Sequence, residues 1–343
     1  MDKRTVLRRI SSDTSFPQVE PLEARLLMSG DVSVGVSRGT LVIRGDSASN
    51  HIVIDQAGLA EGQFRITGQD GTKINGQDDL IVSSVTRDVK VRLGDGMDVL
   101  EMAGVAISRD LIVRGGHSGE TFNITGGSVG RNVTVKAGEG DNTTTVDGTA
   151  LGGRLTVTGG RGVDLLNLAG DVIVTRQLTF KPGHGETSCT ISEATVGGDF
   201  VLASRGGPAS VSLLFSQFQD RVNINTGKEA DNILIEYSEF QDDFIALTGD
   251  GNDIVMLEQT TLAPLGEEFV PKPIGTHFAQ SATIRLGKGN DVLAIGYDNV
   301  GVAFTQYIKL SGGSGEDTLR FDVAIGGVSS SYSAFEHVDT VTS

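Results

Sequence analysis

Acidic side chains recur at a fixed place in a repeating pattern along this chain. Four residues after a glycine that returns about every 22 residues, seven of ten positions carry a carboxylate. The ten positions are Asp98, Glu120, Asn142, Asp164, Thr187, Ser210, Asp231, Asp253, Asp291 and Asp317. Carboxylates stacked about 4.8 Å apart on neighbouring strands repel one another, and a Ca²⁺ ion with oxygen ligands would relieve that repulsion. The pattern therefore predicts candidate calcium sites.

The best candidates lie in the second half of the chain. They are Asp231 over Asp253, with Asp250 beside them, and Asp291 with Asp317. Thr187 and Ser210, in the middle of the column, could not hold an ion in this way. A second interpretation needs no metal, because an aspartate can close its own glycine-rich turn through a hydrogen bond to the backbone. Both interpretations stay open at the level of sequence.

The turns that carry these acids resemble a known calcium-binding repeat. The residue two after the leading glycine is again glycine in seven of ten repeats, which gives the pattern GxGxD. This pattern is similar to the core of the RTX repeats, and that resemblance implies Ca²⁺ as a cofactor. RTX proteins place nine-residue repeats in direct succession, whereas here one GxGxD occurs per 22 residues. The second half of each RTX-type site is therefore missing.

Two further groups of residues suggest chemistry on a polysaccharide. Gly183, His184 and Gly185 form a GHG sequence, and Asp242 and Asp243 form an adjacent pair, which together resemble parts of polygalacturonases. The pair follows the GHG instead of preceding it and lies nearly three repeats away, and the GHG occupies an ordinary turn of its repeat. These residues therefore favour turn chemistry over catalysis.

A column of basic residues also recurs with the repeat. It comprises Arg92, Arg114, Lys136, Lys181 and Arg285. Lyases of the parallel β-helix fold use basic residues on an outer strand face, so this column could hold an acidic polysaccharide. The alternative that we favour is that it balances the acidic turns, at under about 1 kcal/mol per pair. The absence of Trp and the four Tyr weaken the case for a sugar-binding cleft with aromatic platforms.

The element that must position all these residues is a coil of about 22 residues. Its leading glycines are Gly94, Gly116, Gly138, Gly160, Gly183, Gly206, Gly227, Gly249, Gly287 and Gly313. One repeat reads VKVRL, a GDGMD turn, VLEM and VAI, which gives three short strands with the alternation typical of half-buried strands. A fixed period of this length indicates a solenoid. The sequence predicts an all-β fold, a right-handed parallel β-helix.

Equivalent residues of successive coils should stack in columns. Such an inward column is expected from Val89, Leu111, Val133, Leu155, Leu178, Val201 and Val222. Phe218 and Phe240, which are 22 residues apart, should form an aromatic step. The single cysteine, Cys189, lies in an apolar segment and is expected in the core.

The repeat also divides the chain. We expect a leader at 1–30, N-terminal coils or a hairpin-rich cap at 31–88, and the β-helix at 89–321. A protruding loop is predicted at 258–281, which carries three of the seven prolines, and a C-terminal cap at 322–343. The net charge of −16 argues against a nucleic-acid partner. No run of 18 apolar residues occurs, so no transmembrane segment is expected.

The N-terminus has a basic start without the apolar segment of an ordinary signal peptide. Its PLEARLLMS sequence resembles the LEPR-XLL signature found on repeat-rich exported proteins of planctomycete bacteria. Leu22, Glu23, Arg25, Leu27 and Met28 carry the resemblance, with Ala24 where proline is usual. The resemblance implies export to the cell envelope or beyond. The expected function is a non-enzymatic structural or adhesive surface module with an extracellular polymer or protein as partner. The alternatives are a calcium-dependent matrix protein and a polysaccharide lyase or hydrolase.

Overall fold

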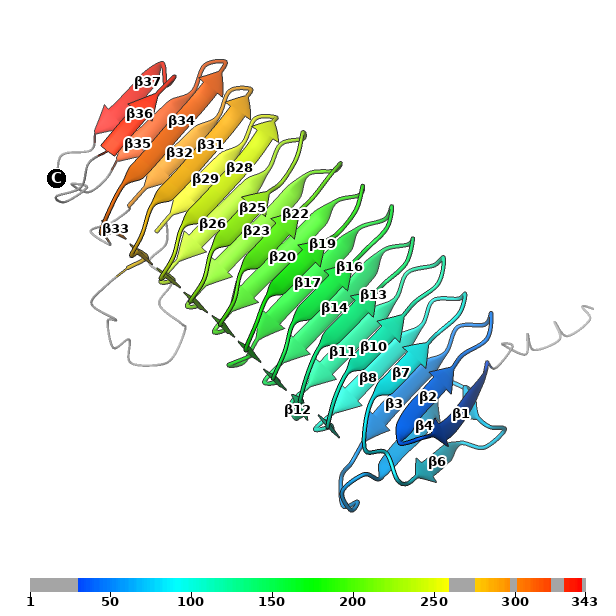
Figure 1. Ribbon diagram of the computed structural model, residues 1–343. Coiled ribbons are helices and arrows are strands. Elements are labelled where there is room, and N and C mark those ends of the chain that lie inside the picture. Colours follow the sequence, from blue (N-terminus) through cyan, green and yellow to red (C-terminus); the bar gives the residue numbers. More distant parts are fainter. Residues whose placement is uncertain (1–29, 259–274, 297–300, 322–329, 341–343) are drawn as a thin grey trace, which may run out of the picture.

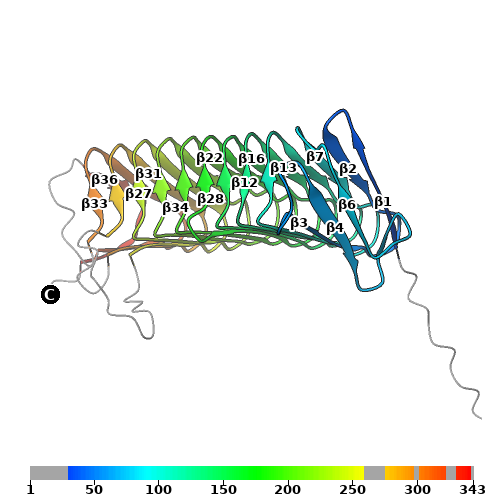
Figure 2. The ribbon, with the colours of Figure 1, turned by 90° about the horizontal axis from the view of Figure 1, so that it is seen from below.

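The computed structural model describes residues 30–258, 275–296, 301–321 and 330–340. In these residues the chain winds into a long stack of coils, which Figures 1 and 2 show from two sides. Strands are the only regular elements in the described part, and each regular coil contributes one strand to each of three sheets. The predicted parallel β-helix with coils of about 22 residues is therefore confirmed.

Two sheets of 14 strands run along the whole described stack, and a third sheet of nine strands runs from β9 to β33. Sheet 1 contains, in spatial order, β36 (Ser330–Ser333), β34 (Ile308–Ser314), β31 (Ala282–Lys288), β28 (Phe244–Asp250), β25 (Val222–Asn225), β22 (Phe200–Ala203), β19 (Leu178–Lys181), β16 (Leu155–Thr158), β13 (Val133–Lys136), β10 (Leu111–Arg114), β7 (Val89–Arg92), β2 (Thr40–Arg44), β1 (Asp31–Ser37) and β5 (Lys73–Ile74). Sheet 2 contains β37 (His337–Thr340), β35 (Thr318–Phe321), β32 (Val292–Ile295), β29 (Ile254–Leu257), β26 (Asn232–Glu236), β23 (Ala209–Leu214), β20 (Thr187–Ser192), β17 (Asp164–Ala169), β14 (Asn142–Asp147), β11 (Thr121–Thr125), β8 (Val99–Ala103), β3 (His51–Asp55), β4 (Phe64–Gln69) and β6 (Asp79–Val82). Sheet 3 consists of two-residue strands: β33 (Ala303–Phe304), β30 (His277–Phe278), β27 (Glu239–Phe240), β24 (Gln217–Phe218), β21 (Thr195–Val196), β18 (Ile173–Val174), β15 (Ala150–Leu151), β12 (Ser128–Val129) and β9 (Ala106–Ile107).

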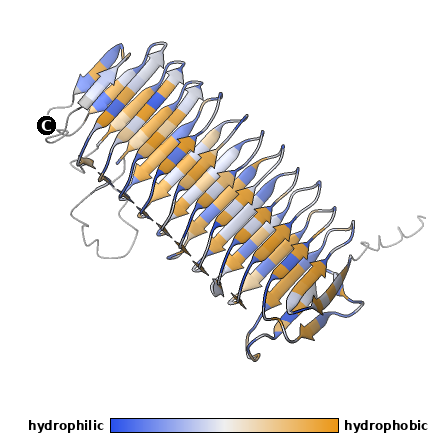
Figure 3. Cartoon of the chain, viewed as in Figure 1, coloured by the Kyte–Doolittle hydropathy of each residue, from blue (hydrophilic) through white to orange (hydrophobic). Residues whose placement is uncertain are grey.

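Strict register between coils places equivalent side chains above one another. In sheet 1, Leu111 pairs with Val89 on one side and with Val133 on the other, and all three are buried. Alternate residues along each strand face the core, which Figure 3 shows as alternating hydrophobic and hydrophilic positions. Cys189 lies in this core, as predicted, and burial raises the pKa of its thiol. Packing of aliphatic columns is what lets coils that could not fold singly stabilise one another.

One member of the predicted inward column is wrong. Leu178 pairs with Phe200, which is fully buried, while Val201 points to the outer side of the sheet. The prediction took the turn glycine as its reference, and in this coil the glycine is shifted by one residue. Gly206 lies next to His184, and Arg205 occupies the place that Gly183 has one coil earlier. The strand register is kept at 22 residues while the glycine moves by one.

The predicted aromatic step is confirmed and is longer than expected. Phe218 stacks on Phe240 with a centroid distance of 5.1 Å, Phe240 on Phe278 at 4.7 Å, and Phe278 on Phe304 at 5.0 Å. Because Phe278 belongs to β30, the third strand of its coil begins at His277 inside the segment 258–281 that we expected to be a loop. The middle of that segment, 259–274, lies outside the described residues.

The two ends of the stack differ. At the N-terminal end β2 and β3 continue the parallel coils, while the antiparallel pairs β1–β2, β3–β4 and β4–β6 cover them. Segment 31–88 thus combines a coil with a hairpin-rich cap. At the other end β36 and β37 extend sheets 1 and 2 in parallel, so the described part of 322–343 adds strands to the two large sheets.

Candidate functional site

The predicted acidic column lies inside the solenoid, at the first position of the sheet 2 segment in each coil. We call it the acidic ladder and define it by Asp98, Glu120, Asn142, Asp164, Thr187, Ala209, Asp231, Asp253, Asp291 and Asp317. Every member is buried, with at most 2% of its surface exposed. Ser210 was predicted in the column, but Ala209 pairs with Thr187 and takes that place. The cause is the same one-residue shift of the glycine in this coil.

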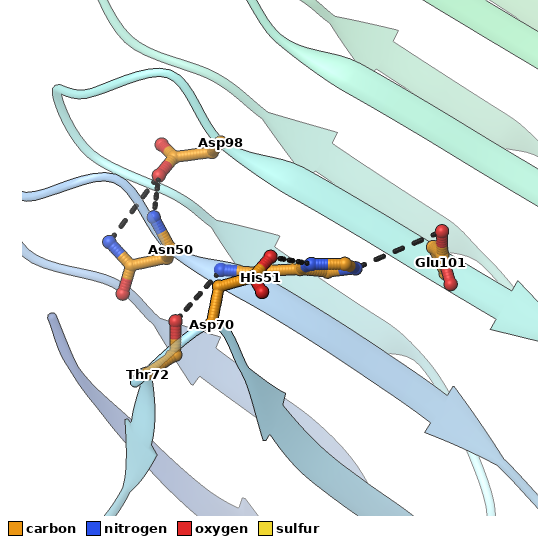
Figure 4. A network of polar contacts seen from close by, with 6 residues as sticks. All are labelled: Asn50, His51, Asp70, Thr72, Asp98 and Glu101. Atoms are coloured by element: carbon orange, nitrogen blue, oxygen red, sulfur yellow. Dashed lines mark hydrogen bonds and ion pairs between the residues drawn. The ribbon is translucent and has the colours of Figure 1, made fainter. Parts of the chain in front are cut away.

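Six of the seven acids in the ladder bind the coil before them through a backbone N–H. A side-chain oxygen accepts the N–H of the equivalent residue one coil earlier, as from Asp231 to Asp253 (2.8 Å), from Asp253 to Asp291 (2.8 Å) and from Asp291 to Asp317 (2.9 Å). The exception is Asp164, which accepts the side-chain amide N–H of Asn142 at 2.9 Å. The ladder begins at the N-terminal cap, where the Asn50 N–H donates to Asp98 over 2.7 Å (Figure 4). Asn142 does the same for Glu120 with an amide oxygen, at 3.2 Å. The ladder is therefore a series of hydrogen bonds between coils, a role that needs an acceptor and not a charge.

Glycine is required where the acidic side chains of the ladder lie directly against the backbone of the turn. An added Cβ at Gly159 would overlap the carboxylate of Asp164, and one at Gly312 would meet that of Asp317 at 2.7 Å. Gly159 and Gly312 directly precede the leading glycines Gly160 and Gly313, where an added Cβ would instead meet carbonyl oxygens of the coil before. At Gly251, a second glycine of the pattern, an added Cβ would meet the Asp253 carboxylate at 2.8 Å. Close packing of the turns is therefore a physical reason for the GxGxD pattern that does not involve an ion.

Burial makes the charged form of these acids costly. Desolvation raises the pKa of Glu120 to about 7 and those of Asp164, Asp231 and Asp291 to about 6. The second carboxylate oxygen has no hydrogen-bond partner within the described structure in six members, Asp98, Asp164, Asp231, Asp253, Asp291 and Asp317. Such an oxygen could be satisfied in two ways, by binding a proton or by binding a cation.

The arrangement fits a calcium ion poorly. Asp231, Asp253, Asp291 and Asp317 are brought onto consecutive coils as predicted, but each already uses one oxygen on a backbone N–H. Asp250 lies on the outer side of its turn, 3.1 Å from the Lys288 ammonium. In the part of the chain that the structure describes, no three acidic, histidine or cysteine side chains converge on a point that could hold a metal ion. The described ladder therefore offers at most one free carboxylate oxygen per coil, where calcium takes six to eight ligands.

The predicted basic column exists, on the outer side of sheet 1 and one turn away from the acidic ladder. Arg92, Arg114 and Lys136 are equivalent residues of β7, β10 and β13 and are exposed. Arg44 of β2 pairs with Arg92 and extends the row at its N-terminal end. We call these four residues the basic ladder. Arg44 was missed because it lies in the irregular N-terminal segment, where 48 residues separate it from its partner.

The interpretation that this column balances the acidic turns is wrong for the basic ladder. The turn acid Asp95 lies 2.7 Å from His117, and Glu139 lies 3.7 Å from Arg161. Among the described residues, none is an ion-pair partner of Arg44, Arg92, Arg114 or Lys136. The sequence pattern also missed a second basic row, Arg87, Arg109 and Arg131, whose backbones pair at the other end of the same strands. Arg285 lies in a distant coil between Leu247 and Ser311.

The residues that resembled polygalacturonase motifs do not meet. His184 lies in the turn after β19, whereas Asp243 precedes β28, three strands further along sheet 1 and at the opposite end of its strand. Asp243 accepts a hydrogen bond from the Ser281 hydroxyl (2.6 Å) and so joins neighbouring coils. The GHG glycines occupy an ordinary turn, as the sequence indicated.

Comparison with known proteins adds no relative. No family model, no curated protein and no solved structure matches this chain. The LEPR-XLL resemblance stays a prediction, and its residues 22–28 lie outside the described part. No helix in the described residues has the length and apolarity needed to cross a membrane.

Proposed function

We propose that this chain is an exported, non-enzymatic surface module, a stiff rod that displays regular outer faces for structural or adhesive contact. The observation that carries the proposal is the use of the repeated acids. They lie in hydrogen bonds between coils, so that the most regular chemical feature of the sequence serves the rod itself. The outer faces are then left for contact with other molecules. Export rests on the N-terminal resemblance.

Localisation in the host tests this proposal directly. An epitope-tagged full-length chain should be digested when intact cells are treated with a protease. A variant without residues 1–30 should stay protected inside the cell, and a cytoplasmic marker should stay protected in both strains. A full-length chain that is protected in intact cells would overturn the proposal.

Calcium dependence is a second candidate, favoured by one observation. Six buried carboxylates each have an oxygen without a hydrogen-bond partner in the described structure. If Ca²⁺ binds there, the folded state gains stability by linkage, about 3 kcal/mol at a hundredfold excess over Kd. Thermal unfolding followed by circular dichroism in EDTA and in millimolar Ca²⁺ measures this gain.

The matched variant for that experiment is Asp231→Asn with Asp253→Asn. It keeps the oxygen that accepts the backbone N–H, as Asn142 does naturally, but removes the charge that would hold an ion. Calcium dependence predicts a shift in the unaltered protein that the variant loses. Equal melting with and without Ca²⁺ in the unaltered protein would contradict it.

A further inference from the structure

The basic ladder is a straight row of like charges on an acidic protein. Arg44, Arg92, Arg114 and Lys136 occupy equivalent positions on four adjacent strands of sheet 1, and all are exposed. Adjacent strands are about 4.8 Å apart, so the row carries one cation per 4.8 Å along the solenoid axis. In water two such charges repel by about 1 kcal/mol, a cost that salt reduces. No acid of the described residues offsets it by an ion pair.

A groove continues the row. Thr158 and Lys181 follow Lys136 in the same register on β16 and β19. Both line a shallow groove together with Arg161, His184 and Arg205, and Glu139 is its one acidic lining residue. Since Glu139 already lies 3.7 Å from Arg161, the groove keeps an excess of positive charge. The ladder and the groove thus form one basic edge over six consecutive coils, from β2 to β19 with the turn that holds Arg205 beyond it.

We propose that this basic edge binds a linear carboxylated polysaccharide, lying along the solenoid axis. The planar guanidinium of arginine pairs with a carboxylate through two parallel hydrogen bonds, and a polyuronate presents one carboxylate per sugar. A periodic row of cations suits a periodic anion, because each coil then repeats the same contact. The inference names the partner of the adhesive module proposed above and rests on that proposal.

The same observations disfavour nucleic acid on this edge. Single-stranded nucleic acid is held by aromatic side chains on which its bases stack, and the lining of the groove and the ladder contain only aliphatic, hydroxyl, charged and imidazole side chains. Duplex DNA carries one negative charge per about 1.7 Å, and a protein of net charge −16 repels so dense a polyanion. A polyuronate has a lower charge density along its axis.

The experiment measures binding of the purified full chain to a fluorescently labelled oligogalacturonate of about ten sugars by anisotropy. The methyl-esterified oligomer, which has the same backbone without the charge, and a single-stranded DNA oligomer are the control ligands. The test variant combines Arg92→Gln, Arg114→Gln and Lys136→Gln. The matched variant combines Arg285→Gln, Lys309→Gln and Arg320→Gln, which removes the same charge from exposed positions in distant coils.

The proposal expects at least about a tenfold loss of affinity in the ladder variant and less than about a twofold change in the matched variant. Thr158→Lys, which fills the one gap between Lys136 and Lys181, should tighten binding, and added salt should weaken it. Equal losses in both triple variants, equal binding of the methyl ester, or tighter binding of DNA would overturn the proposal. Circular dichroism melting confirms that each variant is folded. Failure here leaves the localisation result untouched, so the two proposals can fail separately.

Discussion

In the early coils a cation and a ladder residue stand six residues apart on the two sides of one glycine turn, as Arg92 and Asp98 or Arg114 and Glu120 do. The acids point inward, are 1% exposed and hold backbone N–H groups of the preceding coil. The arginines point outward and have no ion-pair partner in the described residues. Two columns with the same period thus differ in environment, since one is buried and the other is exposed. The difference teaches that burial, and not periodicity, separates a structural column from a surface that is available for binding.

The glycine turn that separates the two columns should be the most sensitive point. Gly287 has a φ of 114°, and an added Cβ would clash with the carbonyl oxygen of Gly249 in the coil before it. We expect Gly287→Ala to lower the free energy of unfolding by more than about 3 kcal/mol, because backbone strain adds to the clash. The measurement is urea unfolding followed by circular dichroism.

Gly104→Ala is its control. Gly104 also has a positive φ, 61°, but an added Cβ would have no heavy atom within 4 Å. Gly104→Ala should then introduce only the strain of the left-handed conformation and lower the free energy of unfolding by about 1–2 kcal/mol. Equal losses at both glycines would show that close approach between turns does not set the register of the columns.

The acidic ladder should depend on its acceptor oxygen more than on its charge. Asp253→Ala leaves the buried N–H of Asp231 without its partner, and we expect a loss of about 1–3 kcal/mol in the free energy of unfolding. Asp253→Asn keeps an oxygen in place, as Asn142 does, and should cost clearly less. Chemical denaturation measures both. If the two variants are equally unstable, the charge itself is required and the structural interpretation of the ladder fails.

The ladder should also make stability depend on pH. The pKa of Glu120 in the folded state is raised to about 7 from an ordinary value of 4.5, so the folded protein holds that proton more tightly than the unfolded chain. The contribution of Glu120 to the free energy of unfolding is complete below pH 4.5 and is lost as the pH rises through about 7. Between about pH 5 and pH 8 we expect the free energy of unfolding to fall by on the order of 1 kcal/mol because of this residue.

Glu120→Gln should reduce that pH dependence in a series of thermal melts, while Asp164, Asp231 and Asp291, whose pKa values are raised to about 6, should supply the part that remains. Gln keeps an oxygen for the Asp98 N–H and has no proton to lose in this range. The exposed acid Glu139 provides the control, and Glu139→Gln should leave the slope as it is. A slope that Glu120→Gln does not change would place the titrating group elsewhere.

The smallest effect is expected on the basic ladder. Arg114 lies between Arg92 and Lys136, so Arg114→Gln should raise the free energy of unfolding at low salt, by less than about 1 kcal/mol, and half-molar salt should abolish the gain. Arg221→Gln is the opposite case, since Arg221 lies 3.6 Å from Asp199 and its removal should give no gain. A loss of stability in Arg114→Gln would mean that this side chain has a structural partner.

The regular part of the fold followed from the period of the sequence, and the irregular coil did not. The glycine spacing and the alternation of Val89, Val91 and Leu93 were enough to predict the coil and its inward faces. Phe200 and Ala209 were misplaced as Val201 and Ser210, because turn glycines were taken as the reference while the strands set the register. His277 and Phe278 were assigned to a loop, since an insertion separates them from the rest of their coil.

The sequence predicted that acidic and basic residues form two columns, but it did not predict the environment of either column. The sequence by itself determined the period, the parallel stacking and most residues of both columns, because a one-dimensional repeat forces equivalent residues above one another. Only the tertiary structure decided which column is buried in hydrogen bonds and which has no ion pair within the described residues. It also joined Arg44 to the basic ladder and separated His184 from Asp243. The physical reason is that spacing along the chain fixes which residues align, while the direction of each side chain and its neighbours depend on how the turn closes over the core.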